Sequence, residues 1–528
     1  MRPWWQRAVL YQVYPQSFQD TNGDGIGDLI GITRRLDYLV DVLGVDAIWL
    51  NPFYRSPMVD GGYDVTDHRD VDPRFGALDD FDQLLAAAHS RGLRVLVDYL
   101  PACTSDEHPW FQESSQSRTA AKRDWYVWRD PRADAGPPNN WLAHWGGPAW
   151  TWHPPTEQYY LHTYLHRMPD LNWENPDVRR DMFDVVRFWL DRGVDGFRVD
   201  SAHIIGKDPG LRDNPPNTDG ILEFGRPHGD IDSQLHLYDR GAGDVHGIYR
   251  QFRAILDQYG AVSIGEVAVT DPHVWASYYG TQLDELHMPF NFRLLGLSWN
   301  AKAVQAVIDT VETVLPPGAW PNWVLGNHDE PRVASRLGPA RARVAMMLLL
   351  TLRGTPTIYY GDELGMPDVT VPRDRVRDPW EHRMPGLGLG RDPERSPMRW
   401  NTSPHAGFCL PETEPWLPLV DSAHSVSVQL KDPQSMLALT RRLLQLRRTH
   451  PEITRASYQA IPNVPDECLA YARGRLLVLL NFSDQPVDVD LRAYGHGELL
   501  VGTHERDPRI SLGRLVLQGD EGLVVVPR

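Results

Sequence analysis

The feature that most constrains the fold is an alternation, over the first two-thirds of the chain, of short apolar strand-like runs with helical stretches. Parallel strands need a crossover connection, usually a helix, so this alternation predicts a parallel α/β barrel. In residues 79–89, Phe81, Leu84, Leu85 and Ala88 recur with helical spacing and predict a helix packed outside the barrel. The predicted strands are residues 9–14, 47–50, 94–100, 196–199, 262–265, 323–326 and 357–360.

Two stretches break this alternation, and a chain of 528 residues has room for additional domains. Residues 103–172 are rich in Trp, Pro, Asn and Gly and are longer than a normal barrel connection, which predicts an inserted subdomain after the third strand. From residue 451 short strands separated by Gly and Asp turns predict a C-terminal β-sandwich. The predicted domains are 1–102 and 173–450 (barrel), 103–172 (insert) and 451–528 (β-sandwich).

The charge of the chain excludes some classes of partner. The formal net charge is −17, with 53 Lys and Arg against 70 Asp and Glu, and a nucleic-acid backbone would be repelled. No apolar run is long enough to cross a membrane, and no secretory signal pattern opens the sequence. Cys103, Cys409 and Cys468 are too few for a disulfide framework or a four-thiolate zinc site. We therefore expect a cytoplasmic protein that binds neither nucleic acid nor membrane.

Carboxylates stand just beyond three of the predicted strands. Asp200 closes GFRVD, Glu266 closes SIGE and Asp329 lies in LGNHD. The carboxyl ends of barrel strands meet at one face, so we expect these three side chains in one pocket. Two carboxyl groups, one ionised and one protonated, can cleave a glycosidic bond with retention of configuration. The alternative for any single acid is a helix cap or an arginine pair; three together, beside Arg198 and His328, weigh against it.

A series of motifs runs through nearly the whole chain: AVLYQVYPQSFQDTNGDGIGDLIGI, GYDVTDH, MPDLN, GFRVD, GEV, GNHDEPR, YYGDELGM and RDPERSPMRW. By these motifs and their order the chain resembles the α-amylase-type glycoside hydrolases (glycoside hydrolase family 13), within them the α-glucosidase and oligo-1,6-glucosidase branch. The resemblance implies a (β/α)8 TIM barrel in which Asp200 is the nucleophile, Glu266 the general acid and base, and Asp329 the acid that stabilises the transition state. Arg198, two residues before Asp200, can hold it ionised, although a structural salt bridge is the alternative.

The resemblance also implies which residues bind the sugar. Tyr63 would stack on the sugar ring and Asp64 would accept its hydroxyl hydrogens. Arg391 resembles the arginine that pairs with Asp64, and Arg395 is a weaker alternative for that pairing. His328 would donate a hydrogen bond to the sugar.

The segment DTNGDGIGD predicts a cation site, because oxygen-bearing side chains alternate there with glycines. It departs from the EF-hand pattern, since Gly31 stands where a closing glutamate is expected. The resemblance implies a structural calcium, with magnesium possible and a metal-free turn as the alternative. The candidate ligands are Asp20, Asn22, Asp24, Asp28 and the carbonyl of Ile26.

Two features depart from or refine the family pattern. The family usually has an Asn-His pair after the third strand, where this chain has Ala102 and Cys103. A thiol is a weak hydrogen-bond partner, so recognition of a sugar 6-hydroxyl could be weakened, and the substrate could be a 6-modified sugar; the alternative is sequence drift in an ordinary glucosidase.

Ser201 directly follows the predicted nucleophile. In the branch that the chain resembles, a small residue at this position accompanies α-1,4 preference and valine accompanies α-1,6 preference.

Together these features predict a retaining α-glucosidase acting on short α-glucosides from the non-reducing end, with α-1,4 favoured over α-1,6 and with transglycosylation as an option. The predicted partner is an oligosaccharide or α-glucoside, and the predicted assembly is a monomer or homodimer. A trehalose synthase-like isomerase or a sucrose-type glucosyltransferase would use the same carboxylates. A non-catalytic partner-binding module is a remote alternative, because its relatives have a membrane helix and lack the three acids.

Overall fold

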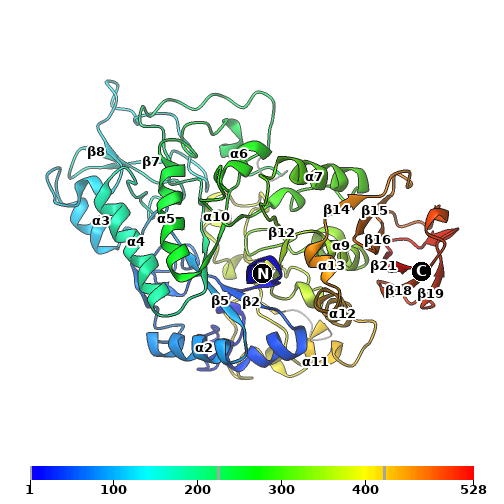
Figure 1. Ribbon diagram of the computed structural model, residues 1–528. Coiled ribbons are helices and arrows are strands. Elements are labelled where there is room, and N and C mark those ends of the chain that lie inside the picture. Colours follow the sequence, from blue (N-terminus) through cyan, green and yellow to red (C-terminus); the bar gives the residue numbers. More distant parts are fainter. Residues whose placement is uncertain (1–2, 223–225, 420–423) are drawn as a thin grey trace.

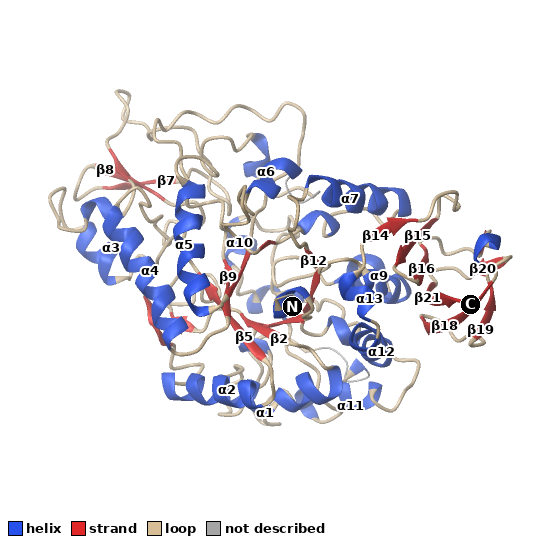
Figure 2. Cartoon of the chain, in the orientation of Figure 1, coloured by secondary structure: helices blue, strands red, loops and turns tan. Residues whose placement is uncertain are grey.

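A sheet of eight parallel strands forms the centre of the molecule (Figure 2). The computed structural model describes residues 3–222, 226–419 and 424–528. The strand order is β11-β10-β9-β5-β2-β1-β13-β12, which closes almost completely into a barrel and confirms the predicted fold. The strands are β1 (Leu10–Val13), β2 (Ala47–Leu50), β5 (Arg94–Tyr99), β9 (Gly196–Val199), β10 (Val262–Gly265), β11 (Met288–Pro289), β12 (Asn322–Val324) and β13 (Thr355–Tyr359).

Seven of these strands overlap the runs predicted from the sequence, and β11 was missed. It has two residues, one of them Pro289, and it pairs only through Ile264↔Met288 and Gly265↔Pro289. So short a strand has no apolar periodicity, and proline removes a ladder hydrogen bond. Its place in the sheet is set by its neighbour β10, which local sequence cannot show.

Helices surround the barrel and pack on it through apolar faces. Helix α2 (Leu78–Ser90) buries Phe81, Leu84, Leu85 and Ala88, the face predicted from their spacing. The other long helices are α4 (Pro176–Asp191), α5 (Val245–Tyr259), α7 (Ala301–Val314), α9 (Pro339–Thr351) and α12 (Met436–Thr449). The shorter helices are α1 (Leu29–Arg34), α3 (Pro109–Ser114), α6 (Pro272–Ser277), α8 (Val333–Leu337), α10 (Pro379–Arg383), α11 (Val426–Gln429) and α13 (Pro451–Arg455).

Residues 103–172 leave the barrel after β5 and form a separate lobe at the upper left of Figure 1. This lobe contains α3 and the antiparallel sheet β6-β8-β7, and the nearby loop after β2 carries the hairpin β3–β4. Trp141 and Trp150 pack with Val127, Ala149 and Leu161 in a small core, and Leu211 and Tyr238 from outside the insert pack against it. The strands are β3 (Tyr54–Arg55), β4 (Asp67–Val71), β6 (Trp128–Arg129), β7 (Trp150–His153) and β8 (Gln158–Leu161).

The C-terminal β region lies at the far right of Figure 1 and follows α12 and α13. One antiparallel sheet has the order β14-β15-β16-β21-β18-β19, and a second consists of β17 and β20. Leu477, Leu479, Leu515 and Leu523 are among the buried residues between them. The strands are β14 (Tyr458–Ala460), β15 (Cys468–Arg473), β16 (Leu476–Asn481), β17 (Val487–Val489), β18 (His496–Gly502), β19 (Arg509–Ser511), β20 (Leu515–Leu517) and β21 (Gly522–Pro527).

The three cysteines are free and buried. Within the described ranges, the helices are all too short or too polar to span a membrane.

Candidate active site

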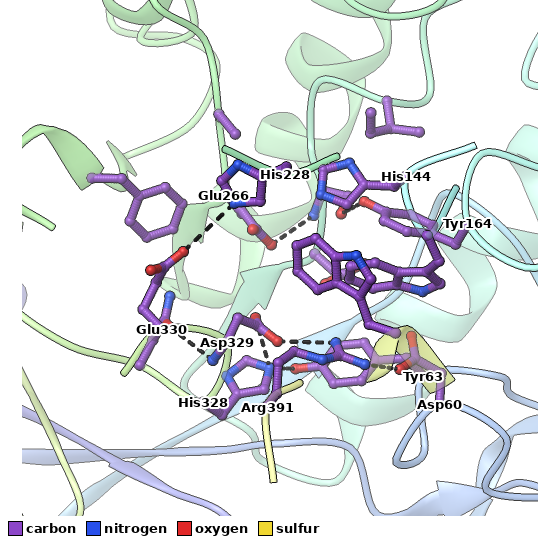
Figure 3. A pocket seen from close by; sticks show the side chains of 18 of the residues that line it. Asp60, Tyr63, His144, Tyr164, His228, Glu266, His328, Asp329, Glu330 and Arg391 are labelled. Atoms are coloured by element: carbon purple, nitrogen blue, oxygen red, sulfur yellow. Dashed lines mark hydrogen bonds and ion pairs between the residues drawn. The ribbon is translucent and has the colours of Figure 1, made fainter. Parts of the chain in front are cut away.

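Three of the predicted acids meet in one pocket at the carboxyl ends of the barrel strands. Asp200 directly follows β9, Glu266 directly follows β10, and Asp329 lies beyond β12. Strands β9 and β10 pair in parallel with Val199 opposite Gly265, so Asp200 and Glu266 leave the sheet as neighbours. All three line the same pocket, and Figure 3 shows Glu266 and Asp329 on its walls. The geometry therefore brings the three carboxylates together.

Arg198 stands at the centre of the acidic cluster. Its side chain is 2% exposed. Its Nη1 lies 2.7 Å from Asp200 Oδ1 and 3.1 Å from Asp98 Oδ1, and its Nη2 donates to Glu266 Oε2. A guanidinium can serve three carboxylates because it presents five donors in a fixed plane. The predicted contact of Arg198 with Asp200 is present, and Arg198 also holds two further acids.

Sequence reasoning missed Asp98, the third partner of Arg198. Asp98 lies in β5 directly opposite Arg198 of β9 in the parallel ladder, and it is fully buried. Burial raises the pKa of Asp98 to about 7, although Arg198 lowers it. The rule that found Asp200 and Glu266, a carboxylate near the carboxyl end of an apolar strand, also applies to the segment RVLVDY and would have found it.

The electrostatics of Asp200 and Glu266 disfavour ionisation of both groups at once. Burial raises the pKa of both carboxyl groups, and Arg198 opposes this rise in each. The charge of Glu266 raises the pKa of Asp200 further, and the charge of Asp329 does the same for Glu266. Two like charges in one buried site repel each other, so burial and this repulsion together disfavour ionisation of both carboxyl groups. The cluster can therefore present one ionised and one protonated carboxyl group together.

Asp329 is held in the ionised form. Burial alone would raise its pKa, but His328, Arg391 and Arg395 lower it well below the ordinary value. Arg391 Nη1 and Arg395 Nη2 lie 3.1 and 2.9 Å from Asp329 Oδ1. Both arginines that the sequence offered as alternatives thus contact this carboxylate.

His328 and Tyr63 form the floor of the pocket (Figure 3). Their rings are stacked with centroids 5.4 Å apart, and His328 Nε2 lies 2.7 Å from the Tyr63 hydroxyl. The amide nitrogen of Gln12 lies 2.8 Å from His328 Nδ1 and donates to it, so we assign the ring hydrogen to Nε2. Burial lowers the pKa of His328 well below its ordinary value and keeps the ring neutral. His328 can therefore act as a neutral hydrogen-bond donor.

The predicted pairing of Arg391 with Asp64 is wrong. Arg391 Nη2 instead contacts Asp60 Oδ1 and Asp378 Oδ1, the latter at 2.6 Å. Asp64 is fully buried and accepts hydrogen bonds from Ser56 and from the backbone N–H groups of residues 59 and 60. Asp60, and not Asp64, lines the pocket beside Tyr63, as Figure 3 shows. The sequence marked the motif correctly, but which acid turns toward Arg391 depends on the fold of residues 60–64.

Ala102 and Cys103 are buried and are not among the residues that line the pocket. Cys103 forms an isolated antiparallel bridge with Asp170, which connects the end of the insert to its beginning. Burial raises the pKa of the Cys103 thiol well above its ordinary value. The thiol is therefore protonated at neutral pH, and a contact between Cys103 and the substrate stays a prediction.

The insert supplies a wall of the pocket that the sequence did not identify. His144, Trp145, Tyr164 and Met168 from residues 103–172 line it. Trp145 packs on Trp380 of α10, with ring centroids 4.4 Å apart. Scattered aromatic residues in an irregular segment have no spacing that signals a common pocket, so only the folded insert reveals them.

The pocket has further lining residues that the sequence did not single out. His203, His228, Arg240, Phe292 and Glu330 line it. Figure 3 shows His228 above Glu330, and Glu330 forms a 2.9 Å ion pair with Arg226. Glu330 directly follows Asp329 in GNHDEPR, so its position in a recognised motif was the available signal.

Ser201, the residue after Asp200, forms hydrogen bonds with both the insert and the acidic cluster. Its hydroxyl forms a hydrogen bond with the Tyr164 hydroxyl, and its backbone N–H donates to Glu266 Oε2 at 3.2 Å. Its φ of 43° lies in the left-handed region. Ser201 therefore links the insert to the acidic cluster.

The Asp20–Asp28 loop is ordered by its own hydrogen bonds. Asp20 Oδ1 accepts from the backbone N–H groups of Asn22 and Gly23, Asn22 Oδ1 accepts from Asp24 N, and Asp24 Oδ1 accepts from Ile26 N. Asp28 caps α1 by accepting from Gly31 N.

The oxygen donors of this loop suit a hard cation in chemical type. However, in the part of the chain that the structure describes, no group of three or more His, Cys, Asp or Glu side chains is arranged to hold a metal ion. A calcium site in this loop therefore stays a prediction.

Comparison with known proteins agrees with this geometry. Residues 12–456 match the family model described as alpha amylase, catalytic domain. The chain is 41% identical to a probable alpha-glucosidase of Rhizobium meliloti, over 93% of this chain and 91% of that protein. It is 36% identical to the oligo-1,6-glucosidase of Parageobacillus thermoglucosidasius, over 99% of both chains.

Two solved structures extend the comparison. The alpha-glucosyl transfer enzyme XgtA superposes with a TM-score of 0.93 at 41% identity, over 100% of both chains. The trehalulose synthase MutB from Pseudomonas mesoacidophila superposes with a TM-score of 0.88 at 33% identity, over 100% of both chains. The chain is thus a member of the α-amylase family of glycoside hydrolases.

Proposed function

We propose that this protein is a retaining α-glucosidase that removes glucose from the non-reducing end of short α-glucosides, with α-1,4 linkages favoured over α-1,6. The observation that carries the proposal is the cluster of Asp200 and Glu266 around Arg198, on neighbouring strands, with the pKa of both carboxyl groups raised by burial. A retaining mechanism needs one ionised and one protonated carboxyl group in one pocket.

In the first step, a carboxylate oxygen of Asp200 attacks the anomeric carbon of the bound sugar. Glu266 donates its proton to the glycosidic oxygen as the bond to the leaving group breaks, and a covalent glycosyl-enzyme forms. Ionised Asp329 lies where positive charge develops on the sugar ring and stabilises it. Arg198 favours the ionised form of Asp200 through the 2.7 Å contact and so opposes the rise in pKa that burial causes.

In the second step, Glu266 is a carboxylate and removes a proton from water. The water oxygen attacks the anomeric carbon, the bond to Asp200 breaks, and glucose leaves with its configuration retained. A sugar or another alcohol in place of water gives a transfer product by the same bond changes.

Asp60, Arg391, Tyr63 and His328 would hold the sugar at the end of the pocket shown in Figure 3. The Asp60–Arg391 ion pair lies in the pocket lining and offers both acceptors and donors to sugar hydroxyls. Contacts of this kind with the hydroxyls of a terminal sugar suit cleavage at the non-reducing terminus of a chain.

Glucosyl transfer is the second candidate, and a specific similarity favours it. The two solved structures reported above are described as a glucosyl transfer enzyme and a trehalulose synthase. The rings of Trp145, Trp380 and His228 beside the acids could bind an acceptor sugar and keep water out. The ratio of free glucose to transfer product, measured at rising acceptor concentration, separates the two activities.

A trapping experiment tests the nucleophile. A fluorinated α-glucosyl reagent should label Asp200, and Asp200→Asn should lower kcat on 4-nitrophenyl α-glucoside by ~10⁴-fold or more, because the covalent route is lost. Asp37→Asn makes the same chemical change at an exposed residue paired with Arg91 and should leave kcat unchanged. A label on another residue, or an active Asp200→Asn enzyme, contradicts the proposal.

A further inference from the structure

A second cavity, of about 440 Å³, lies at the base of the barrel. Its residues precede or begin β1, β2 and β5, and the ends of α12 and α13 complete its wall. The catalytic acids follow the opposite ends of the parallel strands, so the two cavities lie at opposite ends of the barrel. The volume falls within the range of about 300–1,000 Å³ that is usual for small-molecule pockets. We call it the base cavity.

Arginine dominates the lining of the base cavity. Among the described residues that line it, the single acid is Asp46, whereas five are arginines: Arg7, Arg94, Arg447, Arg448 and Arg455. This excess of positive charge occurs in a chain whose formal net charge is −17. Guanidinium groups stay protonated at all physiological pH values, so the cavity keeps its charge. It can therefore attract anions although the molecule as a whole is acidic.

Three of these arginines lie close enough to the carboxylate of Asp46 to lower its pKa. Asp46 Oδ2 accepts a 2.8 Å hydrogen bond from Val9 N, so this carboxylate is already bound to the backbone. Burial raises its pKa, while the charges of Arg448, Arg447 and Arg7 lower it. A single carboxylate cannot neutralise three guanidinium groups.

Two arginines of the base cavity are not engaged by any carboxylate that the structure describes. Arg447 is 4% exposed and donates from Nη1 and Nη2 to the carbonyls of Leu350 and Gly354, so it adds positive charge to the wall rather than a free donor. Across the described parts of the chain, Arg7 and Arg448 have no ion pair to a carboxylate. Arg94, in contrast, is paired with Asp195 at 2.6 Å.

We propose that the base cavity binds a phosphate group, either as inorganic phosphate or as the phosphate monoester of a small sugar. Phosphate carries close to two negative charges at neutral pH and accepts several charge-assisted hydrogen bonds. The planar guanidinium of arginine can donate two parallel hydrogen bonds to two oxygens of a phosphate. In a cavity with few carboxylates, these donors are not already taken by acidic side chains. Trp4 lines the same cavity and would give the sugar of a monoester an aromatic surface.

Isothermal titration with inorganic phosphate, and separately with glucose 6-phosphate, tests the proposal at constant ionic strength set with sodium chloride. We expect saturable binding of one ligand per chain. Arg448→Glu should weaken binding by about tenfold or more, because it removes a charge-assisted contact and adds repulsion. Arg514→Glu causes the same change in net charge at an exposed position in the C-terminal β region and should change affinity by less than about twofold.

Further variants protect the test against misfolding and separate the two ligands. Arg7→Gln removes one charge without adding another and should also weaken binding. Turnover of 4-nitrophenyl α-glucoside by Arg448→Glu should match the parent enzyme, because the base cavity is remote from the catalytic end. Trp4→Ala should weaken binding of glucose 6-phosphate but not of inorganic phosphate if the sugar stacks on Trp4. The absence of saturable binding to the parent protein, or equal weakening by Arg448→Glu and Arg514→Glu, overturns the proposal.

Discussion

The two ends of the barrel contain the same kinds of charged side chain in opposite proportions. At the catalytic end one arginine, Arg198, serves three carboxylates. At the base, Arg7, Arg447 and Arg448 act on one carboxylate, that of Asp46. The end with excess carboxylate can take up a proton near neutral pH, whereas the end with excess guanidinium cannot lose one. A cluster with more carboxylates than guanidinium groups can therefore exchange protons near neutral pH, whereas a cluster with more guanidinium groups than carboxylates stays positively charged.

This contrast predicts that arginine is irreplaceable at one end only. Arg198→Lys should lower kcat/KM by about 10²-fold, because an ammonium group is compact and cannot contact three carboxylates in one plane. With weaker pairing, the pKa of the nucleophile rises, so activity should be lost first at acidic pH and the acid limb of the kcat/KM profile should move to higher pH. The pH profile with 4-nitrophenyl α-glucoside measures both effects.

Arg448→Lys is the matched control, since it makes the same substitution at the base. Its pH profile should overlay that of the parent enzyme. If Arg198→Lys keeps an unshifted acid limb, Arg198 does not set the ionisation of Asp200.

The barrel and its acids could be predicted from the sequence because both depend on local pattern. Strand periodicity gave seven of the eight strands, and the position after a strand located Asp200 and Glu266. The features that the sequence did not predict correctly depend on residues that are distant in the chain. β11 exists because β10 pairs with it, and Arg391 chooses Asp60 over Asp64 because of how residues 60–64 fold.

The base cavity illustrates the same limit. Arg7, Asp46, Arg94 and Arg447 are far apart in the sequence, and no motif connects them. Parallel strands place their amino ends together at one face, so a cluster built from these ends has no signature in any single segment. Asp98 differs, because its position near the carboxyl end of the apolar strand RVLVDY is a local signal.

A smaller effect is expected from restoring the usual family pair in Ala102→Asn with Cys103→His. If the missing histidine leaves a sugar hydroxyl without a partner, the loss is about 1–3 kcal/mol, or roughly five- to more than a hundredfold in kcat/KM. The double variant should therefore raise kcat/KM on maltose and lower it on a 6-deoxy analogue. Equal responses of both substrates would show that the departure is drift, and that the catalytic end does not select a 6-modified sugar.

Ser201→Val tests the predicted linkage preference. Added bulk beside Asp200 should lower the ratio of kcat/KM for maltose over isomaltose by about tenfold or more, because one added methyl group in a pocket is worth about 1–3 kcal/mol. Valine at a φ of 43° is also strained, so the Tm should fall. Ser201→Ala removes the hydrogen bond to Tyr164 without adding bulk and is the control. If alanine changes the ratio as much as valine, the hydrogen bond and not bulk sets linkage.

The smallest effect concerns the Asp20–Asp28 loop, which lines neither the catalytic pocket nor the base cavity. A cation that binds only the folded chain stabilises it by mass action, by about 4 kcal/mol at a thousand times its Kd. Unfolding entropy scales with chain length, so in a cooperative transition of 528 residues this amounts to a Tm decrease of about 4 °C after chelation. Turnover at low temperature should not change, because no catalytic step uses the cation.

Asp24→Asn should abolish the change in Tm on chelation, and scanning calorimetry of the parent and the variant measures this change. An unchelated protein without a stoichiometric divalent ion by elemental analysis would show that the loop depends only on its own hydrogen bonds.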